Sequence, residues 1–268
     1  EGSKFNIVTL PCDEYPELPV VKKENGIVLK QNALRDMIRK TIFAVSLDEV
    51  RPILTGVLFD VSGDELTMVA LDGFRMAVKK YGIINDNKFK AVIPGKTLSE
   101  IGKIINENEE SVNIYFSKNH IQVQIEDTII VSRLLEGEFI NYNQILPSEY
   151  KIKLRIPSNQ LMEACDRAAL FARESSNNMI KFEINDDTMI IMSNSQSGDV
   201  HEELKIQKEG SDIEIAFNAK YFIDVLKVME GEEITIEFTT NVSPSIIRPV
   251  KDTDYLYLVL PARFKKNN

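Results

Sequence analysis

The chain carries a long internal repeat, and this repeat limits the folds that are open to it. Residues 93–105 (IPGKTLSEIGKII) align without a gap with residues 217–229 (FNAKYFIDVLKVM), so that Lys96 corresponds to Lys220. Each copy begins at the end of a strand-like apolar run and continues into an amphipathic helix. Because the repeating unit is too large for a solenoid, the pattern is typical of a duplicated domain.

The length of 268 residues leaves room for two such units and a short additional segment. Residues 1–22 are interpreted as the remnant of a preceding domain and a linker, with one short strand at Lys4–Leu10. Residues 23–150 are expected to form a middle domain, and residues 151–268 a C-terminal domain. Each unit shows two helices and roughly eight strands, which predicts an α+β fold of antiparallel sheets with the helices packed on one face.

Composition excludes several other classes of protein. Hydrophobic residues make up 43% of the chain and charged residues 27%, as in ordinary soluble globular proteins. No apolar run approaches the ~20 residues that a membrane-spanning helix needs. The two cysteines, Cys12 and Cys165, form no CxxC pair, so we expect neither a disulfide framework nor a metal site. No cofactor is expected, and the cytoplasm is the expected location.

The net charge of −9 argues at first sight against a nucleic-acid partner, because phosphate binding depends on Lys and Arg. However, the helices expected at Gln31–Phe43, Lys96–Asn106 and Ala219–Met229 each carry a net positive charge. The helix at Ser158–Glu174 is slightly acidic. A solvated face would explain any one of these helices, but the matched lysines of the repeat favour a surface that faces phosphates loosely.

Several motifs resemble those of one protein family and occur in its order. The matching segments are Phe5–Leu18 (FNIVTLPCDEYPEL), Val50–Phe59 (VRPILTGVLF), Val69–Val78 (VALDGFRMAV), Val131–Pro147 (VSRLLEGEFINYNQILP), Phe217–Leu226 (FNAKYFIDVL) and Val242–Pro249 (VSPSIIRP). The family is the bacterial DNA polymerase III beta subunit, the beta sliding clamp. The resemblance implies a homodimer of three-domain subunits that closes a ring around duplex DNA, with helices lining the hole and sheets outside. This chain would lack most of the first domain and could not close the ring alone.

The resemblance also implies a function without catalysis and a set of partners. A ring that encircles DNA tethers polymerases by topology and raises their processivity. The implied partners are duplex DNA of any sequence, the DNA polymerase III alpha subunit, the clamp loader, and other polymerases and repair proteins. The protein partners would dock short peptides with Leu and Phe anchors into a groove between the second and third domains. No membrane partner is implied, and nucleoid association is expected.

The family's functional residues can be carried over position by position. For the peptide groove they are Leu54, Leu71, Gly73, Phe74, Arg75, Met76, Pro147, Leu258, Leu260, Ala262 and Arg263, with Asn218, Tyr221 and Pro244 on the rim. Here Arg75 and Arg263 would hold polar or carboxylate groups of the ligand. For DNA they are Arg51 and Lys96, to which the helix charges add Arg35, Arg39, Lys103, Lys220 and Lys227. Leu170 and Phe171 match an apolar pair at the subunit interface, although the back of a core helix would explain them equally well.

The chain departs from the family's pattern at several positions. Leu71 stands where Thr is frequent and Phe74 where His is common, so the groove is expected to be more apolar or narrower. Ala262 replaces a residue that is often bulkier, which would compensate. The tail Lys265–Asn268 extends past the usual end and could crowd the groove.

Two alternative functions remain open at this point. An enzyme would need a convergent nucleophile, base or metal set, yet His120 and His201 are the only histidines and neither a GxxxxGK[ST] loop nor GxGxxG occurs. Asp72 beside Arg75 could be a catalytic pair, but a turn-stabilising ion pair is the favoured interpretation. The second alternative is a clamp-fold regulatory module that binds peptides without encircling DNA.

Overall fold

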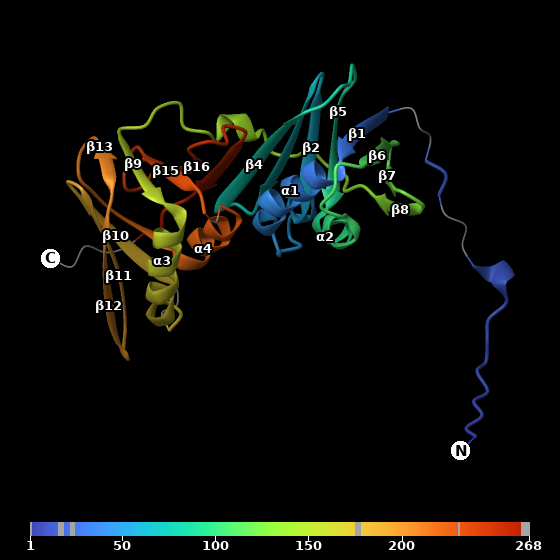
Figure 1. Ribbon diagram of the computed structural model, residues 1–268, viewed down its shortest axis with the longest axis horizontal. Helices are drawn as coiled ribbons and strands as arrows, with labels where there is room; N and C mark the ends of the chain where they lie inside the picture. Colours follow the sequence, from blue (N-terminus) through green and yellow to red (C-terminus); the bar gives the residue numbers. More distant parts are fainter. Residues whose placement is uncertain (1, 16–18, 22–24, 175–177, 230, 264–268) are drawn as a thin grey trace.

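The computed structural model describes residues 2–15, 19–21, 25–174, 178–229 and 231–263. The first of these ranges extends away from the rest of the chain (Figure 1) and contains only a short 3-10 helix, Cys12–Glu14. The predicted strand at Lys4–Leu10 is therefore wrong. Two of its alternating apolar residues, Phe5 and Ile7, are each 84% exposed. A strand that has no neighbouring strand cannot form the hydrogen bonds that its backbone N–H and C=O groups make in a sheet.

The two expected units have corresponding elements in the same order. The middle domain contains β1 (Asn25–Lys30), α1 (Gln31–Thr41), β2 (Gly56–Ser62), β3 (Glu65–Leu71), β4 (Arg75–Gly82), β5 (Lys88–Pro94), α2 (Gly95–Ile104), β6 (Ser111–Phe116), β7 (His120–Ile125) and β8 (Thr128–Arg133). The C-terminal domain contains β9 (Ile152–Pro157), α3 (Ser158–Ala172), β10 (Met179–Asn185), β11 (Thr188–Ser195), β12 (Gly198–Lys205), β13 (Gln207–Glu209), β14 (Ile213–Asn218), α4 (Ala219–Val228), β15 (Glu233–Phe238), β16 (Ser245–Pro249) and β17 (Tyr255–Val259). The short strand β13 is the one addition in the second copy.

Antiparallel sheets and helices form separate layers, as the α+β prediction requires. The sheet orders are β1-β6-β7-β8, β12-β11-β10-β14 and β13-β9-β15-β16-β17-β4-β3-β2-β5. The four helices lie together on one side of these sheets (Figure 1). The duplication is visible in the topology, since β9-β15-β16-β17 repeats the order of β1-β6-β7-β8, and β12-β11-β10-β14 repeats that of β4-β3-β2-β5.

The nine-stranded sheet joins the two domains through β17 and β4. These strands pair antiparallel, with Tyr257 opposite Ala77 and Leu258 opposite Met76. Strand β17 is buried on both faces, which explains its unbroken apolar sequence. Its tyrosines point toward the helices, where Tyr257 donates to the Tyr221 carbonyl at 2.9 Å, while Leu258 belongs to a separate apolar cluster on the opposite face of the sheet.

A buried ion cluster also joins the domains on the helical side of the sheet. The ammonium groups of Lys40 and Lys79, from α1 and β4, lie 2.9 and 2.8 Å from Asp252, which precedes β17. Both lysines are less than 10% exposed. Burial alone raises the pKa of Asp252, but the hydrogen bonds from Lys79 and Lys40 outweigh it and lower the pKa below its ordinary value. The aspartate therefore stays ionised and, together with Asp36, which lies 3.3 Å from Lys40, balances the charge of the two buried cations.

We expect Asp252→Asn to lower the free energy of unfolding by about 1–3 kcal/mol at pH 7, because it removes the carboxylate partner of buried Lys79 and leaves buried Lys40 with Asp36 alone, 3.3 Å away. A group with a lowered native pKa contributes stability above its unfolded pKa of about 3.9 and loses it as pH falls through the native value. The difference from wild type should therefore be constant above about pH 5 and should shrink below about pH 4. Urea unfolding followed by circular dichroism measures it. The exposed neighbour Asp254→Asn is the control, and an equal loss in both variants would contradict the assignment.

Candidate functional site

One contiguous apolar cluster lies on the face of the nine-stranded sheet that points away from the helices. It draws side chains from both domains. Its buried members are Leu54, Leu58, Val69, Leu71, Met76, Val78, Val92, Tyr142, Ile246, Leu256 and Leu258, and Ile53, Leu135, Phe139, Ile145, Leu146 and Leu260 pack against them half-buried. The cluster thus brings together five residues that were assigned to the groove from the sequence: Leu54, Leu71, Met76, Leu258 and Leu260. The buried members form the floor of this surface, and the half-buried ones face solvent.

The segment between β8 and β9 covers part of this face. Leu135 forms a bridge with β5 by donating its N–H to the Val92 carbonyl at 2.9 Å. Further along, the Tyr142 hydroxyl lies 3.4 Å from a carboxylate oxygen of Asp60. Burial and the nearby Asp60 carboxylate raise the pKa of Tyr142, so its hydroxyl keeps its proton and donates. These two contacts fix the segment that supplies Ile145 to the cluster.

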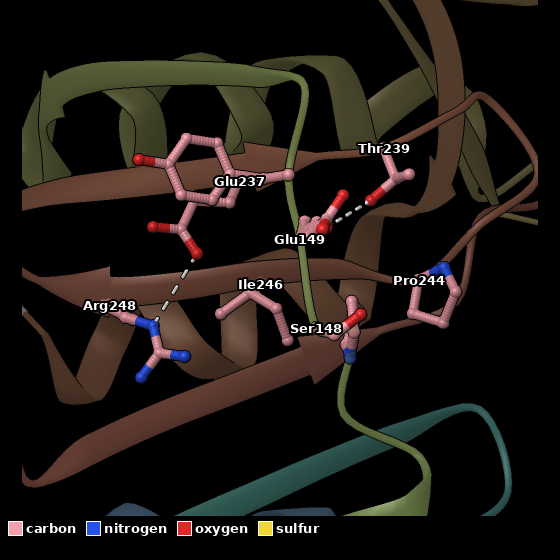
Figure 2. Close-up of a pocket in the computed structure, with 9 residues that line it drawn as sticks. Ser148, Glu149, Glu237, Thr239, Pro244, Ile246 and Arg248 are labelled. Carbon is pink, nitrogen blue, oxygen red and sulfur yellow. Dashed lines mark hydrogen bonds and ion pairs between the residues drawn. The ribbon is translucent and has the colours of Figure 1, made fainter.

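A shallow hollow of about 300 Å³ adjoins the cluster over β15 and β16. Pro147 and Pro244, two of the expected groove residues, line it together with Ser148, Glu149, Tyr150, Glu237, Thr239, Ile246 and Arg248. Figure 2 shows the segment with Ser148 and Glu149 crossing these strands and Arg248 directed toward Glu237. Because Ile246 belongs both to the hollow and to the apolar cluster, the two form one continuous surface.

The turn before β4 borders the cluster. Gly73 has φ of +92°, a conformation that a residue with a Cβ rarely adopts, and it allows the tight reversal from β3 to β4. Asp72 Oδ1 accepts the backbone N–H groups of Phe74 and Arg75 at 2.9 and 3.0 Å. The Phe74 side chain is 59% exposed, and its carbonyl accepts the N–H of Leu260 at 2.8 Å. Phe74 is therefore held beside Leu260 with its ring in solvent.

The Arg75 guanidinium, in contrast, is buried and surrounded by acceptors. Its three nitrogens donate to Asp72 at 2.9 Å, to Asp224 at 2.6 Å and to the Phe43 carbonyl at 2.7 Å. Burial lowers the pKa of Arg75, but Tyr257 and the two carboxylates outweigh this and raise it above its ordinary value. This geometry matches the turn-stabilising interpretation of the Asp72–Arg75 pair.

The remaining expected rim residues lie near the start of α4 and after β17. The Asn218 side chain caps α4 by accepting the N–H of Lys220 at 3.0 Å. The Tyr221 ring stacks on Phe74, with ring centroids 6.3 Å apart. Ala262 is half-buried and donates its N–H to the Ala216 carbonyl at 2.7 Å, while Arg263 is exposed. The tail Lys265–Asn268 lies outside the described residues.

Comparisons with known proteins address the origin of this arrangement. The sequence profile described as "DNA polymerase III beta subunit, central domain" matches residues 28–141, and that of the C-terminal domain matches residues 143–263. The chain belongs to the beta sliding clamp family. The beta sliding clamp of Staphylococcus aureus strain N315 is 39% identical over 265 residues, which cover 97% of this chain and 70% of that protein.

Solved clamp structures have the same fold. The putative DNA polymerase III beta subunit from Eubacterium rectale superimposes with a TM-score of 0.92 at 38% identity, over 98% of this chain and 72% of that one. The Bacillus subtilis sliding clamp gives 0.92 at 37% identity, over 96% and 69%. A Pseudomonas aeruginosa clamp solved with griselimycin bound gives 0.90 at 26% identity, over 95% and 70%. The protein is thus a sliding clamp, a non-catalytic processivity subunit of DNA polymerase III.

The basic residues expected to face DNA divide into two groups. Four have acidic neighbours, in the pairs Arg35–Glu107, Arg39–Asp36, Lys103–Glu100 and Lys220–Asp224, at 2.6 to 3.0 Å. Their side chains are nevertheless 41–67% exposed. The other three, Arg51, Lys96 and Lys227, are exposed, and within the described part of the chain no ion pair to them is found.

The pair expected at a subunit interface lies at the end of α3. Leu170 is 62% exposed, and Phe171 is half-buried. The Phe171 ring lies against β12, where a Cβ on Gly198 would come within 3.1 Å of it. Both residues are thus next to an edge strand and away from the centre of the core.

No group of three or more His, Cys, Asp or Glu that could hold a metal ion occurs among the described residues. In the same residues no helix is long and apolar enough to cross a membrane.

Sequence reasoning missed several members of the outer cluster. A two-residue period from Met76 would have found Val78, and the same period from Leu258 would have found Leu256, because alternate residues of a strand share a face. Ile145 had no such signal, since it lies in an irregular segment.

Burial distinguishes the structural from the exposed members of the cluster. Leu258 is 2% exposed, whereas Leu260 is half-buried beyond the end of β17. We expect Leu258→Ala to lower the free energy of unfolding by about 2–4 kcal/mol, and Leu260→Ala by less than about 1 kcal/mol, because only the first leaves a closed cavity. Urea unfolding of both variants measures this, and equal losses would show that Leu260 is core as well.

Proposed function

We propose that the outer apolar cluster and the adjoining hollow form the groove in which this clamp binds short peptides of its partners. The observation that carries the proposal is that Leu71 and Met76 of the middle domain meet Leu258 and Leu260 of the C-terminal domain in one cluster. A few apolar anchors that fill such a surface supply most of the energy of peptide recognition. By family analogy, the partners are the alpha subunit of DNA polymerase III, the clamp loader, and other polymerases and repair proteins.

The exposed members of the surface define what a ligand meets first. Leu260, Ile145 and Leu146 are half-buried, and the Phe74 ring stands at the edge. The apolar Leu71 and Phe74, at positions where Thr and His are frequent, favour ligands with Leu and Phe anchors.

The first test replaces an apolar contact with a charge. Leu260→Asp should weaken the binding of a fluorescein-labelled peptide with Leu and Phe anchors at least about a hundredfold, because a carboxylate in an apolar surface has no partner. Fluorescence anisotropy measures the affinity, and circular dichroism checks the fold. Lys80→Glu, which changes an exposed lysine on the same sheet whose partner Glu65 lies outside the cluster and the hollow, is the control. Binding of the Leu260 variant at wild-type strength would reject the groove.

We further propose that the helical face meets the backbone of duplex DNA without sequence recognition. The ion pairs of Arg35, Arg39 and Lys103 are exposed, and such pairs contribute little to stability, so phosphates can replace their carboxylates. Lys220 is itself 60% exposed, although its partner Asp224 is largely buried. Lys96 is an exposed cation in the first turn of α2, and Arg51 is an exposed cation on the loop before Pro52. This activity belongs in the cytoplasm, with the nucleoid.

Sheet topology supports a ring built from repeated joints. By the duplication, β8 corresponds to β17 and β12 to β4, the two strands that pair between domains. Both β8 and β12 are edge strands in the described sheets. We propose that a first domain pairs with β8 and that the first domain of a second subunit pairs with β12, beside Leu170 and Phe171. A module that binds peptides without encircling DNA, the alternative function, would not need strands β8 and β12 to pair with further domains.

The second test concerns DNA. Arg51→Glu or Lys96→Glu should weaken association with a linear duplex at low salt by about three- to tenfold and reduce its salt dependence, because each removes a phosphate contact. Lys80→Glu again serves as control, since it makes the same change in net charge and Lys80 shares the outer face of β4 with Met76 and Val78. A duplex titration in which all three variants behave alike would exclude a specific inner surface. By itself this chain should not stay on circular DNA.

A further inference from the structure

We propose that Asp224, on α4 of the C-terminal domain, is a positioning residue for the part of the peptide groove that the middle domain supplies. It acts by holding Arg75, and through Arg75 the turn that presents Phe74. The inference rests on the proposed peptide groove and names a residue that lies outside it.

Among the hydrogen bonds of the Arg75 guanidinium, the one to Asp224 crosses the domain boundary. Of the three acceptors around the Arg75 guanidinium, Asp72 belongs to the same turn and Phe43 to the same domain. Only Asp224 comes from the other domain, with its Oδ2 2.6 Å from Arg75 Nη1. Both side chains are largely buried, at 7% and 17% exposed, so the pair is weakly screened by solvent. A charge-assisted hydrogen bond of this kind fixes direction as well as distance.

The turn is coupled to this pair through Asp72. One Asp72 oxygen holds the backbone of Phe74 and Arg75, and the other accepts from Arg75 Nε at 2.9 Å. A guanidinium fork is planar, so its nitrogens cannot move independently. Releasing Nη1 from Asp224 therefore loosens the Nε contact and with it the turn.

An aromatic contact transmits the same constraint to the rim. Tyr221 lies one turn before Asp224 on α4, and its ring centroid is 4.7 Å from Arg75 Cζ. The Phe74 ring stacks on Tyr221 at an interplanar angle of 22°. Arg75, Tyr221 and Phe74 thus form a layered contact in which the cation orients the tyrosine and the tyrosine orients the rim phenylalanine. Because all the guanidinium nitrogens already have partners, we assign Arg75 to this support and not to a ligand carboxylate.

The test compares Asp224→Asn with Asp252→Asn. Each removes a carboxylate that joins the domains, but Asp252 contacts Lys40 and Lys79 and no residue of the turn. Using the labelled peptide above, Asp224→Asn should raise the dissociation constant about tenfold, since a looser rim must be ordered on binding. Asp252→Asn should stay within about twofold of wild type, and Asp224→Glu, which keeps the charge, within about threefold.

The mobility of a single tryptophan at position 74 distinguishes a loosened turn from a general loss of stability. The chain contains no Trp, so Phe74→Trp places one fluorophore on the rim. In that background Asp224→Asn should lower the fluorescence anisotropy of the tryptophan, and Asp252→Asn should leave it unchanged. Equal effects of the two variants, on affinity or on anisotropy, would overturn the proposal. If Asp224→Asn does not fold, Arg75→Lys carries the test, because Lys cannot make the three contacts together; wild-type affinity in that variant would also overturn it.

The two proposals fail in different ways. If Leu260→Asp binds the peptide like wild type, the groove itself is wrong. If Leu260→Asp abolishes binding while Asp224→Asn leaves it unchanged, the groove stands and Asp224 has no part in positioning it.

Discussion

The pairing of β17 with β4 is the contact on which the rest of the structure depends. It merges the sheets of two domains and, because side chains alternate across a strand, it decides which residues share a face. In this register Leu258 and Met76 point outward into the apolar cluster, while Tyr257 and Ala77 point toward the helices. A slip of one residue would exchange these faces, so the groove and the core are determined together.

The same register explains why charged residues occur in a strand buried on both faces. Arg75 and Lys79 lie on the helical side of β4 and meet Asp224 and Asp252 of the other domain. Burying such charges costs free energy that their pairing only partly offsets, and removing one partner is far more costly than never having the pair. The ion pairs therefore act against alternative arrangements of the domains, whereas apolar contacts on both faces of the sheet, such as Phe43 on Tyr257 on the helical side, supply attraction.

The sequence predicted those parts of the molecule that follow a local period or a repeat. The duplication and the layered α+β fold could be inferred from aligned helices, and the apolar run of β17 from its composition. Lys4–Leu10 shows the limit of this reasoning, because alternation of apolar residues indicates a strand only where a neighbouring strand exists. The partnership of Arg75 with Asp224 had no sequence signal at all, since 149 residues separate them and only the folded sheet brings them together.

A repeated joint also explains how weak contacts can suffice for a clamp. Four of the seven basic side chains expected to face DNA are paired with carboxylates, so no single phosphate is held strongly. Retention on DNA must then come from closure of the ring, which depends on joints between domains. Within this chain that joint is the β17–β4 pairing, and the duplication places its two equivalents, β8 and β12, at sheet edges. One type of strand pairing would thus serve twice, since it builds the proposed peptide groove between two domains and, in our proposal, joins the edges through which the ring closes.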